Sequence, residues 1–401
     1  MKRFAHTISI LCSIMLLALG MQSCKKELPE PAPQAMTHTV IVYMGAENSL
    51  NTFSKSDINE MMFAHKDIPK DCQIVIFKDD IGLPSISLLN NKGLTTWKEY
   101  KDEINSADAS TMKKVLQGII SDFPSTRYSL ILWSHGNGWY NRTRTISRSI
   151  IIDNGNNTHS DYGSWIHISD LAKILSSLPR MDYIFFDACY MQTVEVAAEL
   201  YPYTDYIIGS PTEIPGNGAP YHLIMKDLCL SNPQGIIDGY ASGYPGEYGV
   251  LLSVVSCADF PDFCAATTKY ICKTFPKDNM PPNAGIQIYA PRYGLSHSTQ
   301  NSMPVPFDMR SAMHRLLDQD DFATWNRQWQ RTILYPVSAK KWDTICSEFT
   351  YGNFHCTLTD AEHYGGISMN IPNPLYDSKG WNEMFRQSTW YTLAGWQGTG
   401  W

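Results

Sequence analysis

Leu130-Ile131-Leu132-Trp133-Ser134-His135-Gly136 is a run of four apolar residues that stops at a serine, a histidine and a glycine. A second run of the same kind, Tyr183-Ile184-Phe185-Phe186, leads directly into Asp187-Ala188-Cys189. Short apolar runs bounded by polar residues are typical of strands that are buried on both faces. The two stretches therefore predict two buried strands, one delivering a histidine and the other a cysteine at its carboxyl end.

Strands of this type alternate with amphipathic helices through the first half of the chain. Apolar strands separated by helices predict an α/β fold, in which a mainly parallel sheet carries helices on both faces. Such sheets gather functional groups beyond the carboxyl ends of their strands. We expect further strands at 40–44, 73–77 and 206–208, and helices at 56–65, 111–123 (capped by Ser110 or Thr111), 169–178 and 194–200.

The second half of the chain is less regular and is predicted to be a C-terminal elaboration of the same fold. We expect strands at 285–289 and 366–371 and helices at 305–317 and 381–393. On this basis the catalytic core is placed at residues 37–245, and the C-terminal part of the fold at residues 246–401.

The N-terminus has the pattern of an export signal. Lys2 and Arg3 precede an apolar run that is too short to span a membrane comfortably, and the run leads to Ser23-Cys24. A small residue before a cysteine resembles the lipobox of bacterial lipoproteins, so we expect a signal peptide at 1–23 and lipidation of Cys24. A plain secretory signal is the alternative. The proline-rich residues 24–36 then form a flexible tether, which predicts an exported lipoprotein on the outer membrane, the cell surface or the periplasmic face.

Composition excludes several classes of protein. Hydrophobic residues make up 43% of the chain, which suits a packed globular protein. The formal net charge of −7 supplies no basic surface for nucleic acid, so no nucleic-acid partner is expected. No segment after the signal has the roughly 18 apolar residues of a membrane span. We expect a monomer that is held to a membrane only through Cys24.

The histidine and the cysteine together have the residue types of a cysteine hydrolase. Such an enzyme needs a thiolate, a base that forms it and donors for the developing oxyanion. His135 is the candidate base and Cys189 the candidate nucleophile, while the backbone N–H groups of Gly136 and Cys189 are candidate oxyanion donors. Taken singly, each side chain is more often structural. The pair is more specific, because its separation is close to the roughly 50 residues found in caspases.

The segments 131–139 and 186–191 resemble the His and Cys motifs of the clostripain family of cysteine peptidases, which shares the caspase–hemoglobinase fold. Residues 40–48, 213–218 and 366–372 are also similar to this family. The resemblance implies a caspase-like sheet, peptide or protein substrates, and a catalytic dyad of His135 and Cys189 that proceeds through a thioester.

The resemblance also implies residues that select the substrate. Asp187 matches an acidic residue that shapes the specificity pocket in relatives preferring Arg or Lys; a carboxylate that braces the following helix is the alternative. Relatives with basic specificity tend to carry an acid where this chain has Asn217. Glu213 is close by in the sequence and is a candidate substitute, although loop glutamates are commonly only solvated. Specificity therefore stays open.

Members of this family are often zymogens that are cut between the His and Cys motifs. Residues 141–161 are polar, without helical or strand periodicity, and proteolysis concentrates in such segments. We expect self-cleavage after Arg148, with Arg142 and Arg144 as alternatives.

The sequence also bears on cofactors and on alternative functions. The dyad requires no cofactor, and no residue spacing predicts a metal site. Asp79 and Asp80 are candidates for calcium, although paired acids at a strand end more often face water. One rival function is a surface lipoprotein that binds peptides or glycans on an inactive peptidase scaffold. Another is a thiol hydrolase or transferase that acts on a non-protein amide, because a fold does not determine a substrate.

Overall fold

The computed structural model describes residues 36–140, 149–156, 163–244, 250–280, 286–289, 304–337, 348–351, 354–358 and 365–401. Several predicted features lie outside these residues: the signal peptide, Cys24, nearly all of the tether and much of the 141–161 segment with Arg148. Residues 245–249 also lie outside them, so the boundary predicted at 245 stays a prediction.

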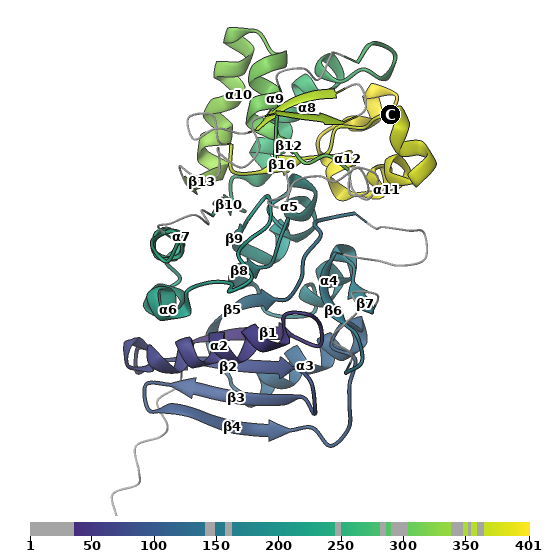
Figure 1. The fold of residues 1–401 in the computed structure, drawn as a ribbon. Helices are drawn as coiled ribbons and strands as arrows, with labels where there is room; N and C mark the ends of the chain where they lie inside the picture. Colours follow the sequence, from purple (N-terminus) through teal and green to yellow (C-terminus); the bar gives the residue numbers. More distant parts are fainter. Residues whose placement is uncertain are drawn as a thin grey trace, which may run out of the picture. The chain divides into compact units, whose positions relative to one another are not determined.

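A nine-stranded sheet organises the described part of the chain (Figure 1). Its five central strands are parallel, and an antiparallel pair of strands flanks them on each side. Apart from the flanking strands, this is the mainly parallel sheet that the sequence predicts. In spatial order the strands are β13 (Ile333–Val337), β10 (Leu252–Ser256), β9 (Thr204–Gly209), β8 (Met181–Asp187), β5 (Ser125–Trp133), β1 (Met36–Gly45), β2 (Cys72–Asp79), β3 (Ser85–Asn90) and β4 (Gly93–Glu99).

Helices cover both faces of this sheet, as predicted. Successive residues of a strand point to opposite faces, so Ile41 and Tyr43 belong to one buried cluster and Val40 and Val42 to the other. The first cluster includes residues of α3 (Ala109–Asp122), α4 (Ile168–Leu175), α5 (Val194–Leu200) and α8 (Phe260–Thr274). The second includes residues of α2 (Asn51–Phe63), α6 (Tyr221–Leu230) and α7 (Pro233–Ser242).

The remaining elements belong mainly to the C-terminal half of the chain. A smaller sheet contains β11 (Gln287–Ile288), β12 (Phe307–Asp308), β14 (Glu348–Tyr351), β15 (Phe354–Leu358) and β16 (Ser368–Met369). A two-stranded sheet joins β6 (Ile150–Asp153) to β7 (Ser164–Ile166), and the further helices are α9 (Met309–Leu316), α10 (Gln319–Thr332), α11 (Trp381–Gln387) and α12 (Thr389–Leu393).

Three predicted elements differ from the structure in their local detail. Residues 305–317 are not a single helix, because the short strand β12 precedes α9, whose first turn is capped by Asp308. Residues 381–393 are two helices, because Ser388 leaves the helical conformation and caps α12. The cap of α3 is Asp108, whose carboxylate accepts the Thr111 N–H at 2.8 Å, instead of Ser110 or Thr111.

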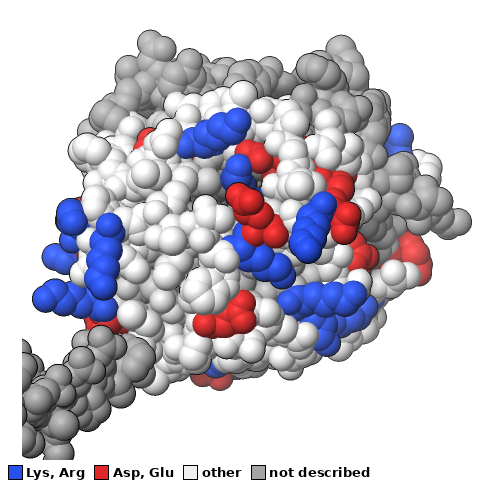
Figure 2. All heavy atoms as spheres, turned by 90° about the horizontal axis from the view of Figure 1, so that it is seen from below, with Lys and Arg blue, Asp and Glu red and all other residues white. Residues whose placement is uncertain are grey.

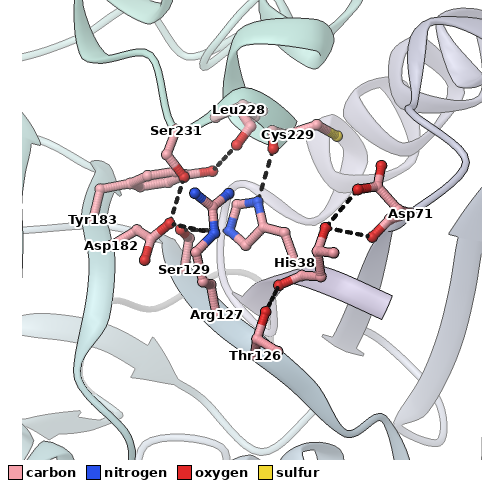
Figure 3. Close-up of polar contacts among 11 residues, drawn as sticks. His38, Asp71, Thr126, Arg127, Ser129, Asp182, Tyr183, Leu228, Cys229 and Ser231 are labelled. Atoms are coloured by element: carbon pink, nitrogen blue, oxygen red, sulfur yellow. Dashed lines mark hydrogen bonds and ion pairs between the residues drawn. The ribbon is translucent and has the colours of Figure 1, made fainter. Parts of the chain in front are cut away.

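Polar contacts at the opposite end of the sheet tie α6 to the starts of the central strands (Figure 3). His38 on β1 contacts the Cys229 carbonyl at 2.8 Å through Nδ1 and the Ser129 hydroxyl at 2.9 Å through Nε2. The Tyr183 hydroxyl on β8 donates to the Leu228 carbonyl at 3.0 Å. These hydrogen bonds pair buried polar groups, which would lower the stability of the fold if they were left without partners. They also hold the carboxyl end of α6 against the amino ends of the central strands.

On the face drawn in Figure 2, Lys and Arg side chains are interspersed with Asp and Glu. Within the described ranges, none of the helices combines the length and the apolar character needed to cross a bilayer.

Candidate active site

The two motif strands lie side by side in matched register, and this brings their following residues together. In the β5–β8 pair, Trp133 is the Cα partner of Asp187, so His135 and Cys189 each follow two residues beyond a paired position. Gly136 packs directly on the cysteine loop: a Cβ atom at this position would lie 2.4 Å from the Cys189 carbonyl oxygen. Glycine is therefore required at position 136 for the two loops to approach this closely.

His135 and Cys189 line the same cavity, which has a volume of about 240 Å³. Both residues are half-buried, so they are covered but reachable from solvent. Asp187 and Glu213 also line this cavity, whereas Asn217 is exposed and is not among its lining residues. The other lining residues are Leu50, Trp133, Ser134, Ile214, Pro215, Gly216 and Gly218.

A serine that the sequence analysis did not identify holds the histidine ring. The Ser49 hydroxyl lies 2.9 Å from His135 Nε2, with the direction of the bond depending on the tautomer. Its neighbour Asn48 donates to the Gly45 and Ile152 carbonyls at 3.0 and 3.1 Å, which fixes the loop after β1. Ser49 could have been predicted as a site residue from its position just after a central parallel strand, because the carboxyl ends of all such strands lie at the same edge of the sheet.

The cysteine is a neutral thiol in this resting arrangement. Burial raises the pKa of Cys189 to about 12, and the nearby carboxylates of Glu213 and Asp187 act in the same direction. The Ile214 N–H, 3.5 Å from the sulfur, opposes this shift by favouring the thiolate. The thiol therefore keeps its proton at neutral pH until a base removes it.

Two buried carboxyl groups lie close to Gly218, and one of them, Asp187, lines the cavity. Asp187 accepts hydrogen bonds from the Ala219 N–H and the Tyr221 hydroxyl, both at 3.0 Å, and so braces the chain leading into α6. Asp57 on α2 accepts a bond from the Trp133 indole at 2.6 Å. A Cβ atom on Gly218 would lie 2.9 Å from the Asp187 carboxylate and 3.1 Å from that of Asp57. Gly218 therefore lies beside both acids, where any side chain would collide with them.

Desolvation keeps this acid pair partly protonated. Burial, reinforced by the negative charge of the neighbouring Asp187, raises the pKa of Asp57 to about 9. Burial likewise raises the pKa of Asp187 to about 6. Like charges in one buried pocket disfavour double ionisation. The sequence held no signal for Asp57, which occupies an ordinary polar position of an amphipathic helix.

A second cysteine and histidine neighbour each other, but both are almost fully buried. Cys72 on β2 is the Cα partner of His38 and is almost fully buried at the start of the sheet. A hydrogen bond from Cys229 lowers the pKa of Cys72 to about 6. Both ring nitrogens of His38 are occupied by structural contacts, as Figure 3 shows for Cys229. This cluster has the reactive residue types without access for a substrate.

Comparison with known proteins identifies relatives of this chain. The model of the clostripain family matches residues 42–320. Clostripain from Hathewaya histolytica is 24% identical over 221 residues, which are 47% of this chain and 42% of that protein. The chain therefore spans less than half the length of this curated relative.

Solved structures match over nearly the whole chain. A secreted C11 cysteine protease from Bacteroides thetaiotaomicron, bound to an irreversible peptide inhibitor, has a TM-score of 0.72 and 26% identity, covering 90% of this chain and 99% of that one. An inactive zymogen C11 protease from Parabacteroides distasonis has a TM-score of 0.72 at 23% identity, covering 91% of this chain and 99% of that one. These likenesses agree with the caspase-like fold that the sequence predicts.

Proposed function

The chain belongs to the clostripain family of cysteine peptidases, and from this premise we propose that it cleaves peptide bonds with Cys189 as nucleophile and His135 as base. The observation that carries the proposal is the shared cavity of these two residues beyond the matched ends of β5 and β8. The nucleophile, the base and the oxyanion donors all belong to the chain, so the chemistry needs no cofactor.

The protonated thiol determines the order of the first step. Because the pKa of Cys189 is raised to about 12, the imidazole of His135 takes the thiol proton as the sulfur attacks the substrate carbonyl carbon. The carbonyl oxygen then becomes an oxyanion, toward which the N–H groups of Gly136 and Cys189 donate. His135 passes its proton to the leaving amine, and a thioester remains on Cys189.

Hydrolysis of the thioester completes the cycle. His135 removes a proton from water as the water attacks the thioester carbonyl, and a second oxyanion forms in the same place. Collapse of this intermediate releases the carboxylic acid product and returns the proton to the sulfur. Acid–base assistance of this kind contributes about 10²–10⁴-fold to the rate.

A randomised peptide library tests this assignment. The purified wild type should cleave it, and the Cys189→Ala variant should not. A thiol-reactive peptidyl probe should label the wild type at Cys189 and leave the His135→Ala variant largely unlabelled. If Cys189 of the folded wild type resists the probe and no peptide is cut, the binding lipoprotein becomes the better explanation.

The buried acid pair supports a preference for Lys or Arg at the substrate position before the scissile bond. Asp187 lines the cavity, Asp57 lies on the other side of Gly218, and position 218 has no side chain that would block the approach to them. A cationic side chain entering there favours ionisation of the pair and gains a charge-assisted bond. Asn217, which supplies no charge, is exposed, whereas Glu213 lines the wall.

Substrates that differ only in charge test this preference. A peptide with arginine before the scissile bond should be cleaved at least about tenfold faster than its citrulline counterpart, which keeps the shape and loses the charge. The Asp187→Asn variant should lose this ratio while it retains cleavage of the citrulline peptide. Equal rates for both peptides with the wild type would contradict a basic preference.

We also propose that the protein is exported and anchored to a membrane by a lipid. The matching protease from Bacteroides thetaiotaomicron is described as secreted, and residues 1–24 of this chain have the signal and lipobox pattern. We expect the protein in the membrane fraction with a lipid on Cys24, and the Cys24→Ser variant in the soluble exported fraction. Retention of that variant on the membrane would argue for another anchor.

A further inference from the structure

A second cavity, with a volume of about 400 Å³, is formed by residues of α4, α5 and α11. None of its lining residues also lines the catalytic cavity. Three of the lining residues are acidic: Asp170 on α4, and Glu195 and Glu199 on α5. Trp139 adds an aromatic side chain, and the exposed Gln387 places part of the lining in contact with solvent.

Glu195 is a buried acid with one oxygen left unpaired. The residue is 1% exposed, and its Oε1 accepts the Asn370 N–H at 2.8 Å. Its Oε2 has no hydrogen-bond partner among the described residues. An unpaired oxygen at a buried position is costly whether the carboxyl group is ionised or protonated, because each form requires a partner. Since Glu195 lines the cavity, a ligand bound there can provide that partner.

The protein supplies no cation to this cavity. In the described part of the chain, Glu195 and Glu199 form no ion pair. Asp170 pairs with Lys173 at 2.8 Å, but Lys173 is not one of the lining residues. Burial lowers the pKa of the lining residue His167, which keeps its imidazole neutral at neutral pH. The two glutamates of α5 are therefore not neutralised by a positive charge of the chain.

The arrangement of these side chains suits an organic cation and does not suit a metal ion. Within the described ranges, no three of the side chains of His167, Asp170, Glu195 and Glu199 bring ligand atoms within 4.8 Å of one another. A metal ion requires such convergence, whereas an ammonium group has three N–H donors that point in different directions. The lining also includes Trp139, and ammonium groups are attracted to tryptophan rings.

We propose that this cavity binds an aliphatic ammonium group through Glu195 and Glu199. The two glutamates are four residues apart on α5, so they lie on the same face of the helix. Glu195 Oε2 accepts one N–H of the ligand. Glu199, whose Oε1 already accepts the Thr389 N–H at 2.9 Å, accepts another through Oε2. Both contacts are charge-assisted hydrogen bonds, and the apolar stem of the ligand packs against Trp139.

Calorimetric titration of the Cys189→Ala variant with pentylamine hydrochloride tests the proposal. At pH 7 and constant ionic strength, pentylamine should bind, whereas 1-pentanol, which has the same stem without the charge, should not. Pentylamine should also raise the melting temperature, because it binds the folded state. Absence of binding at about 50 mM pentylamine overturns the proposal, and so does equal binding of the amine and the alcohol.

Variants in the same background locate the bound amine. Glu195→Gln and Glu199→Gln should each weaken binding by about tenfold or more, because each removes a hydrogen bond to a charged group. Glu199 is only half-buried, so its variant guards against misfolding of the first. Asp238→Asn is the matched control and should leave the affinity unchanged: Asp238 is exposed on α7, which covers the opposite face of the sheet from α5. If Asp187→Asn abolishes binding and Glu195→Gln does not, the amine occupies the catalytic cavity and the proposal is wrong.

Two further ligands distinguish the sources of an aliphatic ammonium group. Nα-acetyl-lysine methylamide carries the lysine side chain as it occurs in a polypeptide, and 1,5-diaminopentane is a free diamine. Glu195-dependent binding of the lysine derivative supports a lysine of a partner protein as the ligand, and such binding of the diamine alone supports a free amine. Acetylation of the lysine Nε removes the charge and should abolish binding; unchanged binding would overturn the proposal. These measurements do not use peptide cleavage, so they are independent of the proposed peptidase function.

Discussion

The Ser49 hydroxyl helps to orient the His135 imidazole. Ser49 contacts Nε2 at 2.9 Å from the loop after β1. A hydroxyl contact positions the ring without adding a charge of its own. The imidazole can therefore accept the Cys189 proton transiently and return it, which suits a thiol that is protonated at rest.

Removing the Ser49 hydroxyl should slow the reaction without weakening substrate binding. A net hydrogen bond contributes about 0.5–1.5 kcal/mol, so we expect the turnover number of Ser49→Ala to fall about two- to tenfold. Steady-state kinetics on a good peptide substrate should show KM little changed. Ser49→Thr keeps the hydroxyl and should behave like the wild type; an Ala variant with full turnover would mean that the contact is incidental.

Asp57 should give the stability of the protein a measurable dependence on pH. Its pKa is raised to about 9 in the folded chain, so between about pH 5 and pH 8 the folded state holds a proton that the unfolded state has released. The free energy of unfolding contributed by this group therefore falls as the pH rises. In Asp57→Asn the group no longer titrates.

Urea denaturation of Cys189→Ala, with and without Asp57→Asn, isolates this contribution. The variant should gain stability relative to its parent as the pH rises, by at most about 1.4 kcal/mol per pH unit. Ionic strength is held constant in both series. A difference in free energy of unfolding that does not change with pH would show that Asp57 titrates normally.

At the scale of elements, the central strands were predictable and the edges of the sheet were not. β1, β5 and β8 are buried on both faces, so their sequences are continuous apolar runs. The edge strand β4 is largely exposed and carries mostly polar residues, so its sequence lacks that signal. β10 and β13 join the sheet from beyond the predicted core, and only tertiary pairing determines that position.

The catalytic residues were predictable for the same reason, whereas Asp57 was not. His135 and Cys189 follow apolar strands directly, so strand order alone places them at one edge. Asp57 approaches Asp187 from a helix on one face of the sheet, and its position depends on how α2 packs against Trp133.

The junction between the β5 and β8 loops gives a prediction for a glycine. Gly136→Ala would force a Cβ atom to 2.4 Å from the Cys189 carbonyl oxygen, so the loops must separate. We expect activity to fall by about 100-fold or more, because the oxyanion donor at position 136 moves with its loop. Peptide hydrolysis measures this, and circular dichroism should confirm that the variant folds.

A matched glycine serves as the control for that substitution. Gly118 lies in α3, where an added Cβ atom would meet no heavy atom within 4 Å beyond its own stretch of helix. Gly118→Ala should keep full activity and stabilise the protein by about 0.5–1 kcal/mol, because alanine is the better helix former. If Gly136→Ala were as active as Gly118→Ala, the close contact between the two loops would have no catalytic role.

At the scale of the whole molecule, the chain on both sides of the expected cleavage segment builds one sheet. β1, β2 and β5 precede residues 141–148, whereas β8, β9 and β10 follow them, and the two groups meet at the β5–β8 pair. The residues on either side of that segment are fixed in the fold as well. Tyr140 and Ser149 are buried, and Gly136 forms an antiparallel β-bridge with Ile150. A cut there would separate the chain covalently without exposing the interior.

Self-cleavage after Arg148 should therefore produce two polypeptides that stay together. Denaturing mass spectrometry of the wild type should show fragments that meet between Arg148 and Ser149, while native size-exclusion chromatography shows one species. Cys189→Ala should remain intact, and Arg148→Ala should shift the cut to Arg142 or Arg144 or abolish it. Because the buried β5–β8 pairing holds the fragments, they should come apart only under conditions that unfold the sheet. Separate elution of the fragments without denaturant would contradict this account, and a wild-type chain that stays intact on prolonged incubation would rule out self-processing.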